Sequence, residues 1–279
     1  MKYKLFFLTF LILFSFTKTN IFTDNTGNQN TVHPSKNMTN IKVMHQIGMK
    51  KYRLGLYKKA LIYFKRILEL KPYNNDALYN CACMNALLRK VDNTIFYLIN
   101  LININRKWKI KLYNGVEKDF RFIKNHPRFI LYKKYWIHGV NTNKLINHIK
   151  GEYAGTTKVD DPEHRFAKTI QFEMILSRRQ LNIGSGIIGI LLQGSAHKVY
   201  KHGNIFLLYA TYPKSYGYEH GFCGTLLLEI KKLNKNSIKV IGGFFKKSLH
   251  SKKYERLKQI NIEGLILLRN LIGEIFIKK

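Results

Sequence analysis

Residues 41–72 read IKVMHQIGMKKYRLGLYKKALIYFKRILELKP. The same pattern of apolar and small residues is repeated 34 residues later, in residues 75–105, and this repeat indicates the fold of the N-terminal half. Apolar or small residues recur at matched positions: Met44 with Leu78, Ile47 with Cys81, Gly48 with Ala82, Phe64 with Leu98, and Ile67 with Leu101. A small residue lets a partner helix approach, and large residues fill the remaining groove. The repetition therefore predicts two helical hairpins.

The first copy resembles the tetratricopeptide repeat, and the resemblance rests on Gly48, Gly55, Tyr57, Ala60, Phe64 and Pro72, with Ala82 in the second copy. The second copy departs from the family at Arg89 and Thr94, where the family has glycine and alanine. Such repeats are binding scaffolds whose groove is lined by outward residues of each first helix. Carried over by position, these residues are Lys42, His45, Met49, Tyr52, Arg53, Asp76, Tyr79, Cys83 and Leu87. This groove suits an acidic or amphipathic peptide, and the alternative is a solvated helix face.

The segment from Trp108 to Tyr135 is similar to the closing element of exported bacterial tetratricopeptide proteins. The similarity lies in Asp119, Phe122 and the run Pro127-Arg128-Phe129, while Asn125 departs from the family's apolar position. A cap of this kind shields the apolar face of the last repeat from water. We therefore interpret these residues as structural and expect a helical domain over residues 41–140.

From residue 141 to 279 the sequence changes to short alternating runs separated by turns. Strands are expected near residues 170–176, 181–192, 204–212, 222–231, 237–245, 264–269 and 272–277. This pattern predicts an antiparallel β barrel or sandwich, and hence an α+β chain with two domains. The runs at 151–155 and 242–245 are similar to motifs of small lipocalin-like barrels. Such a barrel either encloses a small apolar ligand or is filled by side chains such as Phe172, Phe206, Phe222, Phe244 and Phe245.

The charge is strongly positive: 48 Lys and Arg against 16 Asp and Glu give a net +32. A field of this sign attracts acidic proteins, anionic membrane surfaces or nucleic acid. Abundant Lys, Asn, Ile and Tyr also fit a bias toward A/T-rich codons. Because no arginine cluster or zinc-finger spacing accompanies the charge, nucleic acid is not the partner that we expect.

The first residues have the order of a secretory signal: Lys2 and Lys4 precede an apolar run, residues 5–16. We expect a signal peptide over residues 1–19 and a flexible polar linker over 20–40, and so an exported protein, either periplasmic, secreted or envelope-associated. The alternative is an uncleaved membrane anchor. Asn37-Met38-Thr39 forms a glycosylation sequon.

No local constellation indicates catalysis, a metal or a cofactor. Asp160, Asp161, Glu163 and His164 form an acidic cluster that is better explained as a solvated loop, and His220 with Cys223 lacks a fixed base geometry. The run 194–197 lacks the flanking glycine of a hydrolase elbow. The three cysteines, Cys81, Cys83 and Cys223, are interpreted as packing residues.

Three functional hypotheses remain open. The first is a non-enzymatic exported binding or scaffold protein that holds a protein or peptide in its helical groove. The second is a lipocalin-like carrier of a small apolar ligand. The third is a surface-associated protein that is held to an anionic envelope by its positive charge.

Overall fold

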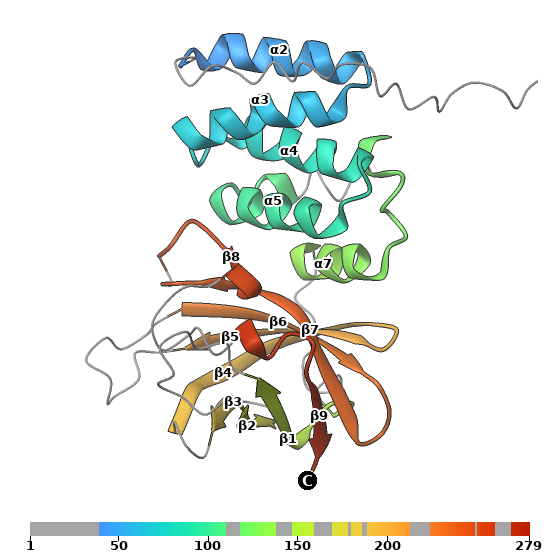
Figure 1. Ribbon diagram of the computed structural model, residues 1–279, viewed down its shortest axis with the longest axis vertical. Coiled ribbons are helices and arrows are strands. Elements are labelled where there is room, and N and C mark those ends of the chain that lie inside the picture. The colour runs from blue at the N-terminus through green and yellow to red at the C-terminus, as the bar shows by residue number, and fades with distance from the viewer. Residues whose placement is uncertain are drawn as a thin grey trace, which may run out of the picture. The chain divides into compact units, whose positions relative to one another are not determined.

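Helices occupy the N-terminal part of the described chain and strands the C-terminal part (Figure 1). The computed structural model describes residues 39–109, 118–137, 147–158, 169–177, 180–185, 189–212, 224–248, 250–259 and 269–279. The predicted leader and most of the predicted linker lie outside these ranges. The described residues form five α-helices followed by a curled antiparallel sheet, and at this level the predicted α+β fold class is confirmed.

Four helices form two hairpins with matching bounds. α2 (Ile41–Arg53) packs on α3 (Tyr57–Leu70), and α4 (Asn75–Leu87) packs on α5 (Val91–Ile104). The second hairpin begins and ends one repeat length after the first. The four helices stack in chain order, since α3 also contacts α4 (Figure 1). No helix within the described part of the chain combines the length and apolar character needed to cross a membrane.

The two hairpins also match in the residues that precede their first helices and in the turns that connect their helices. Asn40 Oδ1 accepts a hydrogen bond from the Val43 amide at 3.2 Å, and Asn74 Oδ1 accepts one from the Ala77 amide at 2.8 Å. Each asparagine thus satisfies an amide that has no partner within its helix. In the turns, Gly55 has φ 72° and Arg89 has φ 57°. The second hairpin therefore keeps the left-handed turn although arginine has replaced glycine.

The small residues of the repeat lie where the helices pack closely, as the sequence predicts. A Cβ atom on Gly48 would lie 2.8 Å from the Phe64 ring, so the close approach of α2 and α3 requires glycine there. Ala60, Phe64 and Ala82 are fully buried. Of the remaining repeat residues, Tyr57 is half-buried against Tyr52, and Pro72 is exposed in the turn before α4.

The expected cap is a short 3-10 helix, η1 (Lys118–Phe120), followed by α7 (Pro127–Ile137). Phe120 and Phe129 are buried and their rings stack at 5.8 Å, and α7 packs on α5 and on strands β4 and β5. Phe122, which the sequence suggested to be structural, is 46% exposed, and its ring makes cation–π contacts with both Arg89 and Arg121.

The sheet is antiparallel throughout its described pairings. Its strands are β1 (Gly151–Lys158), β2 (Thr169–Leu176), β3 (Gln180–Ser185), β4 (Gly189–His202), β5 (Ile205–Tyr212), β6 (Gly224–Lys232), β7 (Ser237–Lys246), β8 (Glu255–Arg256) and β9 (Ile275–Lys278). The order is β6-β5-β4-β3-β2-β1-β9-β7-β8, and β7 also pairs with β6. Following the pairings from β6 through β1 and β9 to β7 therefore leads back to β6.

One expected strand differs from the structure, and another cannot be compared with it. The run 181–192 is not one strand, because β3 ends at Ser185 and the chain reverses before β4 begins at Gly189. The expected strand at 264–269 lies almost wholly outside the described residues. The remaining expected runs overlap β2, β5, β6, β7 and β9.

Strands β5 to β7 are buried on both faces. Phe206, Leu226 and Phe245 belong to the hydrophobic cluster inside the curled sheet. The adjacent residues Leu207, Leu227 and Phe244 belong to a second cluster that they share with the helices. Because successive side chains point to opposite faces of a strand, one face meets the sheet interior and the other meets the helices.

Candidate functional site

The residues of the predicted groove differ in how far they remain accessible. Lys42 and Arg53 of α2 are exposed, while His45 and Met49 are half-buried. In the second hairpin, Cys83 is only 2% exposed, so its side chain is not part of an open surface. Tyr52, Tyr79 and Leu87 are half-buried, and Asp76 is exposed.

Tyr52 is engaged by the cap of the helical array. Its hydroxyl donates a hydrogen bond of 2.9 Å to Asp119 Oδ1, which belongs to η1. Burial and this contact with the Asp119 carboxylate raise the pKa of Tyr52 to about 12. The phenol therefore stays protonated and acts as a donor at neutral pH.

Tyr79 is covered by the segments that follow α5. Its ring lies 4.6 Å from the Trp108 ring and 6.3 Å from the Phe120 ring, between centroids. The chain itself thus occupies the part of the predicted groove that the second hairpin was expected to supply. The accessible remainder lies on α2, where His45 also contacts Asn80 at 3.2 Å.

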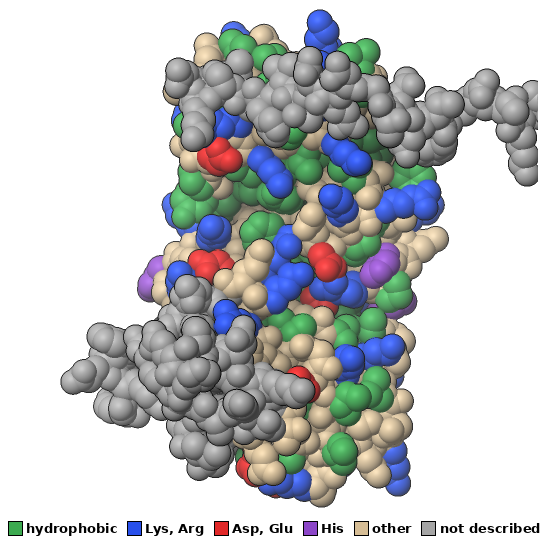
Figure 2. Space-filling view, in the orientation of Figure 1, with side chains coloured by type: hydrophobic (Ala, Val, Ile, Leu, Met, Phe, Trp, Pro, Cys, Tyr) green, Lys and Arg blue, Asp and Glu red, His purple; other side chains and the backbone are tan. Residues whose placement is uncertain are grey.

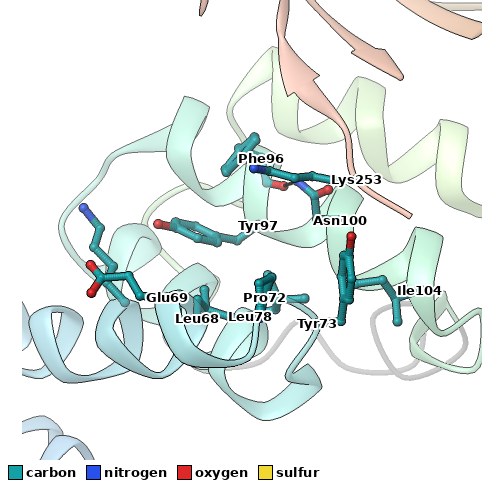
Figure 3. Close-up of a pocket in the computed structure, with 11 residues that line it drawn as sticks. Leu68, Glu69, Pro72, Tyr73, Leu78, Phe96, Tyr97, Asn100, Ile104 and Lys253 are labelled. Carbon is teal, nitrogen blue, oxygen red and sulfur yellow. Dashed lines mark hydrogen bonds between the residues drawn. The ribbon is translucent and has the colours of Figure 1, made fainter. Parts of the chain in front are cut away.

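A different cavity lies on the other side of the hairpins, between the end of α3, α4 and α5. It has a volume of about 360 Å³, within the range of about 300–1,000 Å³ of small-ligand pockets. We call it the apolar pocket. Its apolar lining consists of Leu68, Pro72, Leu78, Phe96 and Ile104, and its polar lining consists of Lys65, Glu69, Tyr73, Tyr97, Asn100 and Lys253 (Figure 3).

The helical periodicity explains why these side chains meet. Phe96, Asn100 and Ile104 recur every four residues along α5 and so lie on one face of that helix. Leu68 from α3 and Leu78 from α4 face them, and Tyr73 and Ile104 lie together at one end of the pocket (Figure 3).

The chain segment after β7 forms the last wall. Asn100 Oδ1 accepts a hydrogen bond of 2.7 Å from the Tyr254 amide, and Asn100 Nδ2 donates one of 3.3 Å to the Tyr254 carbonyl. This reciprocal pair fixes the main chain next to Lys253 and brings the lysine to the pocket beside Phe96 (Figure 3).

The charges around the apolar pocket are unequal. Glu69 forms an ion pair with Arg66 at 2.7 Å. Neither Lys65 nor Lys253, both exposed, takes part in an ion pair among the described residues. The pocket therefore combines an apolar interior with a net positive rim.

Sequence reasoning missed this pocket. Leu68, Tyr73 and Lys253 are not among the binding residues predicted from the sequence. The half-exposed ring of Tyr73, 49% exposed beside the helix-ending Pro72, is a local signal that could have drawn attention to it. Lys253 could not have been found, because it comes from a distant segment.

The contacts that join α7 to the sheet are a second feature that was not predicted from the sequence. Arg128 pairs with Glu229 of β6, whose side chain is fully buried, and Tyr132 donates to the same carboxylate at 2.8 Å. Burial alone lowers the pKa of Arg128, but the Glu229 carboxylate outweighs it and the net shift is upward. A lone acidic residue in the apolar run 226–230 is the signal that could have been noticed.

The other sequence candidates lie outside the described residues: the cluster 160–164, His220 and Cys223. Cys81 and Cys83 are both buried in the helical core. Among the described ranges, no three His, Cys, Asp or Glu side chains are grouped so as to hold a metal ion.

Comparisons with known proteins give no relative: no protein-family model, no curated protein and no solved structure matches this chain.

Proposed function

We propose that this chain is a non-enzymatic binding protein in which the apolar pocket holds a peptide segment of a partner protein. The observation that carries the proposal is the combination of an accessible apolar cavity of about 360 Å³ with a rim that bears Lys65 and Lys253. Helical hairpins commonly bind peptides by taking up apolar side chains in such grooves.

The positive charge of the surface and of the pocket rim favours peptides that carry acidic residues. Figure 2 shows Lys and Arg side chains spread over the visible surface with few acidic ones between them, in keeping with the net charge of +32. A partner segment with an aromatic or aliphatic side chain between acidic residues places its apolar group in the pocket. Its carboxylates then face Lys65 and Lys253. Such complementarity mainly increases specificity and the association rate.

The likeness to tetratricopeptide repeats supports this proposal. The matched helix bounds, the equivalent caps at Asn40 and Asn74, and the equivalent turns at Gly55 and Arg89 are what a repeated binding unit requires. The signal-like residues 1–19 add the proposal that the protein acts after export, at an envelope or in a secreted form.

The packing of the sheet favours a binding protein over a carrier of an apolar ligand. Large side chains such as Phe206, Phe245 and Phe276 are buried together inside the curled sheet. A strand succession that returns on itself fits the proposed barrel, and this cluster indicates that the barrel is filled by its own side chains.

The test is peptide binding by the full-length protein. Fluorescent peptides are compared in which a central phenylalanine or leucine is flanked by acidic, neutral or basic residues. We expect the acidic peptides to bind best. Lys253→Glu should lower their affinity about tenfold, which corresponds to a loss of about 1.4 kcal/mol of binding free energy. Lys252→Glu is the matched control, because it changes the charge equally at the adjacent exposed residue.

A second arm tests the groove predicted from sequence. Arg53→Glu reverses the charge of an exposed residue on α2, away from the apolar pocket. If Arg53→Glu weakens binding and Lys253→Glu does not, the peptide binds on the first helices and the proposed site is wrong. Equal effects of Lys253→Glu and Lys252→Glu would show general attraction to a basic surface.

A further inference from the structure

A second cavity, of about 380 Å³, is formed by residues from α5, α7 and the sheet. Arg106 and Lys109, from the segment just after α5, line it together with Lys198 of β4 and Lys246 of β7. No acidic residue is found among the described residues that line this cavity. We call it the basic pocket, because four cationic side chains converge there without a carboxylate.

This convergence is electrostatically unfavourable, because the four cationic side chains repel one another. Burial lowers the pKa of Lys109, and the nearby charges of Arg106 and Lys198 lower it further. Burial and Arg106 likewise lower the pKa of Lys246. Elsewhere in the molecule a buried cation is compensated, as Arg128 is by Glu229. Around the basic pocket, the described lining offers no such compensation, so an anion would supply the missing charge.

Four tyrosines, Tyr135, Tyr200, Tyr209 and Tyr254, also line the basic pocket. The Tyr135 ring lies 5.4 Å from that of Tyr200 and 6.1 Å from that of Tyr209, and its hydroxyl is hydrogen-bonded to Tyr254. Burial raises the pKa of both Tyr200 and Tyr254 to about 12. The phenols therefore remain protonated at neutral pH and can donate hydrogen bonds to an anion.

Trp136 is a further unused donor. Its side chain lines the basic pocket, its residue is 3% exposed, and its buried Nε1 has no hydrogen-bond acceptor in the described structure. A buried N–H group without an acceptor is costly, and so such groups are uncommon.

The number of charges and donors distinguishes between classes of anion. A carboxylate has one negative charge and two oxygens, which leaves most of four cations uncompensated. A phosphate monoester carries nearly two charges and three terminal oxygens, and both arginine and lysine bind it well. The volume exceeds that of a phosphoryl group alone and lies at the lower end of small-ligand pockets. We infer that the basic pocket binds the phosphoryl group of a small phosphate monoester.

The two pockets use different faces of α5. Asn100 and Ile104 line the apolar pocket, whereas Ile99, Ile102 and Asn103 line the basic pocket. Phosphate binding is therefore a separate property from the proposed peptide binding, and either can fail without the other.

The experiment measures phosphate binding by the full-length protein. Calorimetric titrations with glycerol 3-phosphate and with inorganic phosphate are run at constant ionic strength, with sodium chloride and benzoate as comparison anions. We expect saturable binding of the two phosphates, and much weaker binding of chloride and benzoate. Lys246→Met is expected to weaken phosphate binding at least tenfold. Lys235→Met, in the exposed β6–β7 turn, makes the same change outside the pocket and is expected to leave binding unchanged.

A second variant separates loss of binding from loss of folding. Lys198 is exposed on β4, so Lys198→Met removes a pocket charge with little effect on the core. We expect it to weaken phosphate binding while the unfolding midpoint without phosphate stays unchanged. Equal affinity of parent, Lys198→Met and Lys246→Met, or equal response to benzoate and phosphate, would overturn the inference.

A lipid arm identifies the source of the phosphoryl group. Vesicles that contain phosphatidic acid are compared with neutral vesicles. Binding that requires phosphatidic acid and is lost in Lys198→Met supports a phosphate site that recognises a lipid headgroup, whereas binding of glycerol 3-phosphate supports a soluble ligand. Vesicle binding that Lys198→Met and Lys235→Met reduce equally counts against the pocket, because it reflects surface charge alone.

Discussion

Arg128 and Glu229, which are 101 residues apart in the chain, form a bidentate ion pair across the contact between α7 and β6. Arg128 Nε donates to Glu229 Oε2 at 2.5 Å and Nη2 donates to Oε1 at 2.7 Å, while Nη1 also contacts Asp92 of α5. One side chain thus connects α5, α7 and the sheet. The helices and the sheet are therefore joined by a specific polar contact as well as by a shared hydrophobic cluster.

The first prediction concerns this ion pair. Glu229→Gln leaves the Arg128 charge largely buried without its main partner, and removal of one partner from a buried pair typically costs about 3–5 kcal/mol. We expect the free energy of unfolding, measured by urea titration with circular dichroism, to fall by about this amount. Glu173→Gln removes an ion pair with Lys279 that is exposed on both sides, and should change stability by only about 0–1 kcal/mol. Similar losses in the two variants would contradict the prediction.

The second prediction tests the close approach of α2 and α3. In Gly48→Ala the new methyl group overlaps the Phe64 ring, because a Cβ there lies 2.8 Å from it. Overpacking of this kind costs about 1–3 kcal/mol. Thermal and urea unfolding measure the loss. Gln46→Ala, at an exposed position of the same helix, should stay within about 0.5 kcal/mol of the parent. If Gly48→Ala is as stable as Gln46→Ala, the two helices are further apart than the structure indicates.

The third prediction concerns the hydrogen bonds between Asn100 and the main chain of Tyr254. Asn100→Ala leaves the buried Tyr254 N–H and C=O groups without these partners, and we expect a loss of about 1–3 kcal/mol. Hydrogen exchange of the Tyr254 amide should become faster in the variant. Asn103→Ala is the comparison, since Asn103 makes one long bond of 3.4 Å to Ser251. Unchanged protection of the Tyr254 amide would refute the assignment.

The fourth prediction concerns alkaline pH. Burial raises the pKa of Tyr200 and Tyr254 to about 12 in the folded protein, whereas an unfolded tyrosine has a pKa of about 10. Because the folded pKa is the higher one, the stability from these phenols is fully present below about pH 10 and is lost as the pH rises toward 12. We expect the free energy of unfolding to decline through this window. Tyrosinate absorbance near 295 nm should appear for these two residues only at a higher pH than for an unfolded tyrosine.

A variant isolates the contribution of one phenol. Tyr200→Phe cannot ionise at that position, so its stability should decline less steeply between about pH 10 and 12 than that of the parent. The same comparison at neutral pH corrects for loss of the hydroxyl group itself. A parallel decline in parent and variant would show that Tyr200 ionises with its ordinary pKa.

Short-range patterns in the sequence were sufficient to predict the local structure. The spacing of Gly48, Ala60 and Phe64 specifies which residues share a helix face, and alternation along residues such as Ile170 to Leu176 specifies a strand with one buried face. These patterns predicted the hairpins and the antiparallel character of the sheet. They sufficed because each depends on residues within one or two turns of a helix or within one strand.

Which of these faces pack against one another became clear from the three-dimensional arrangement. The sequence could not show that Trp108 and Asp119 occupy part of the expected groove, that Lys253 completes the apolar pocket, or that Lys198 and Lys246 converge with the residues after α5. Asn100 and Tyr254, for example, are 154 residues apart. Periodicity records which side chains lie on a common face. The partner of that face is set by long-range packing and hydrogen bonding, which leave no local pattern in the chain.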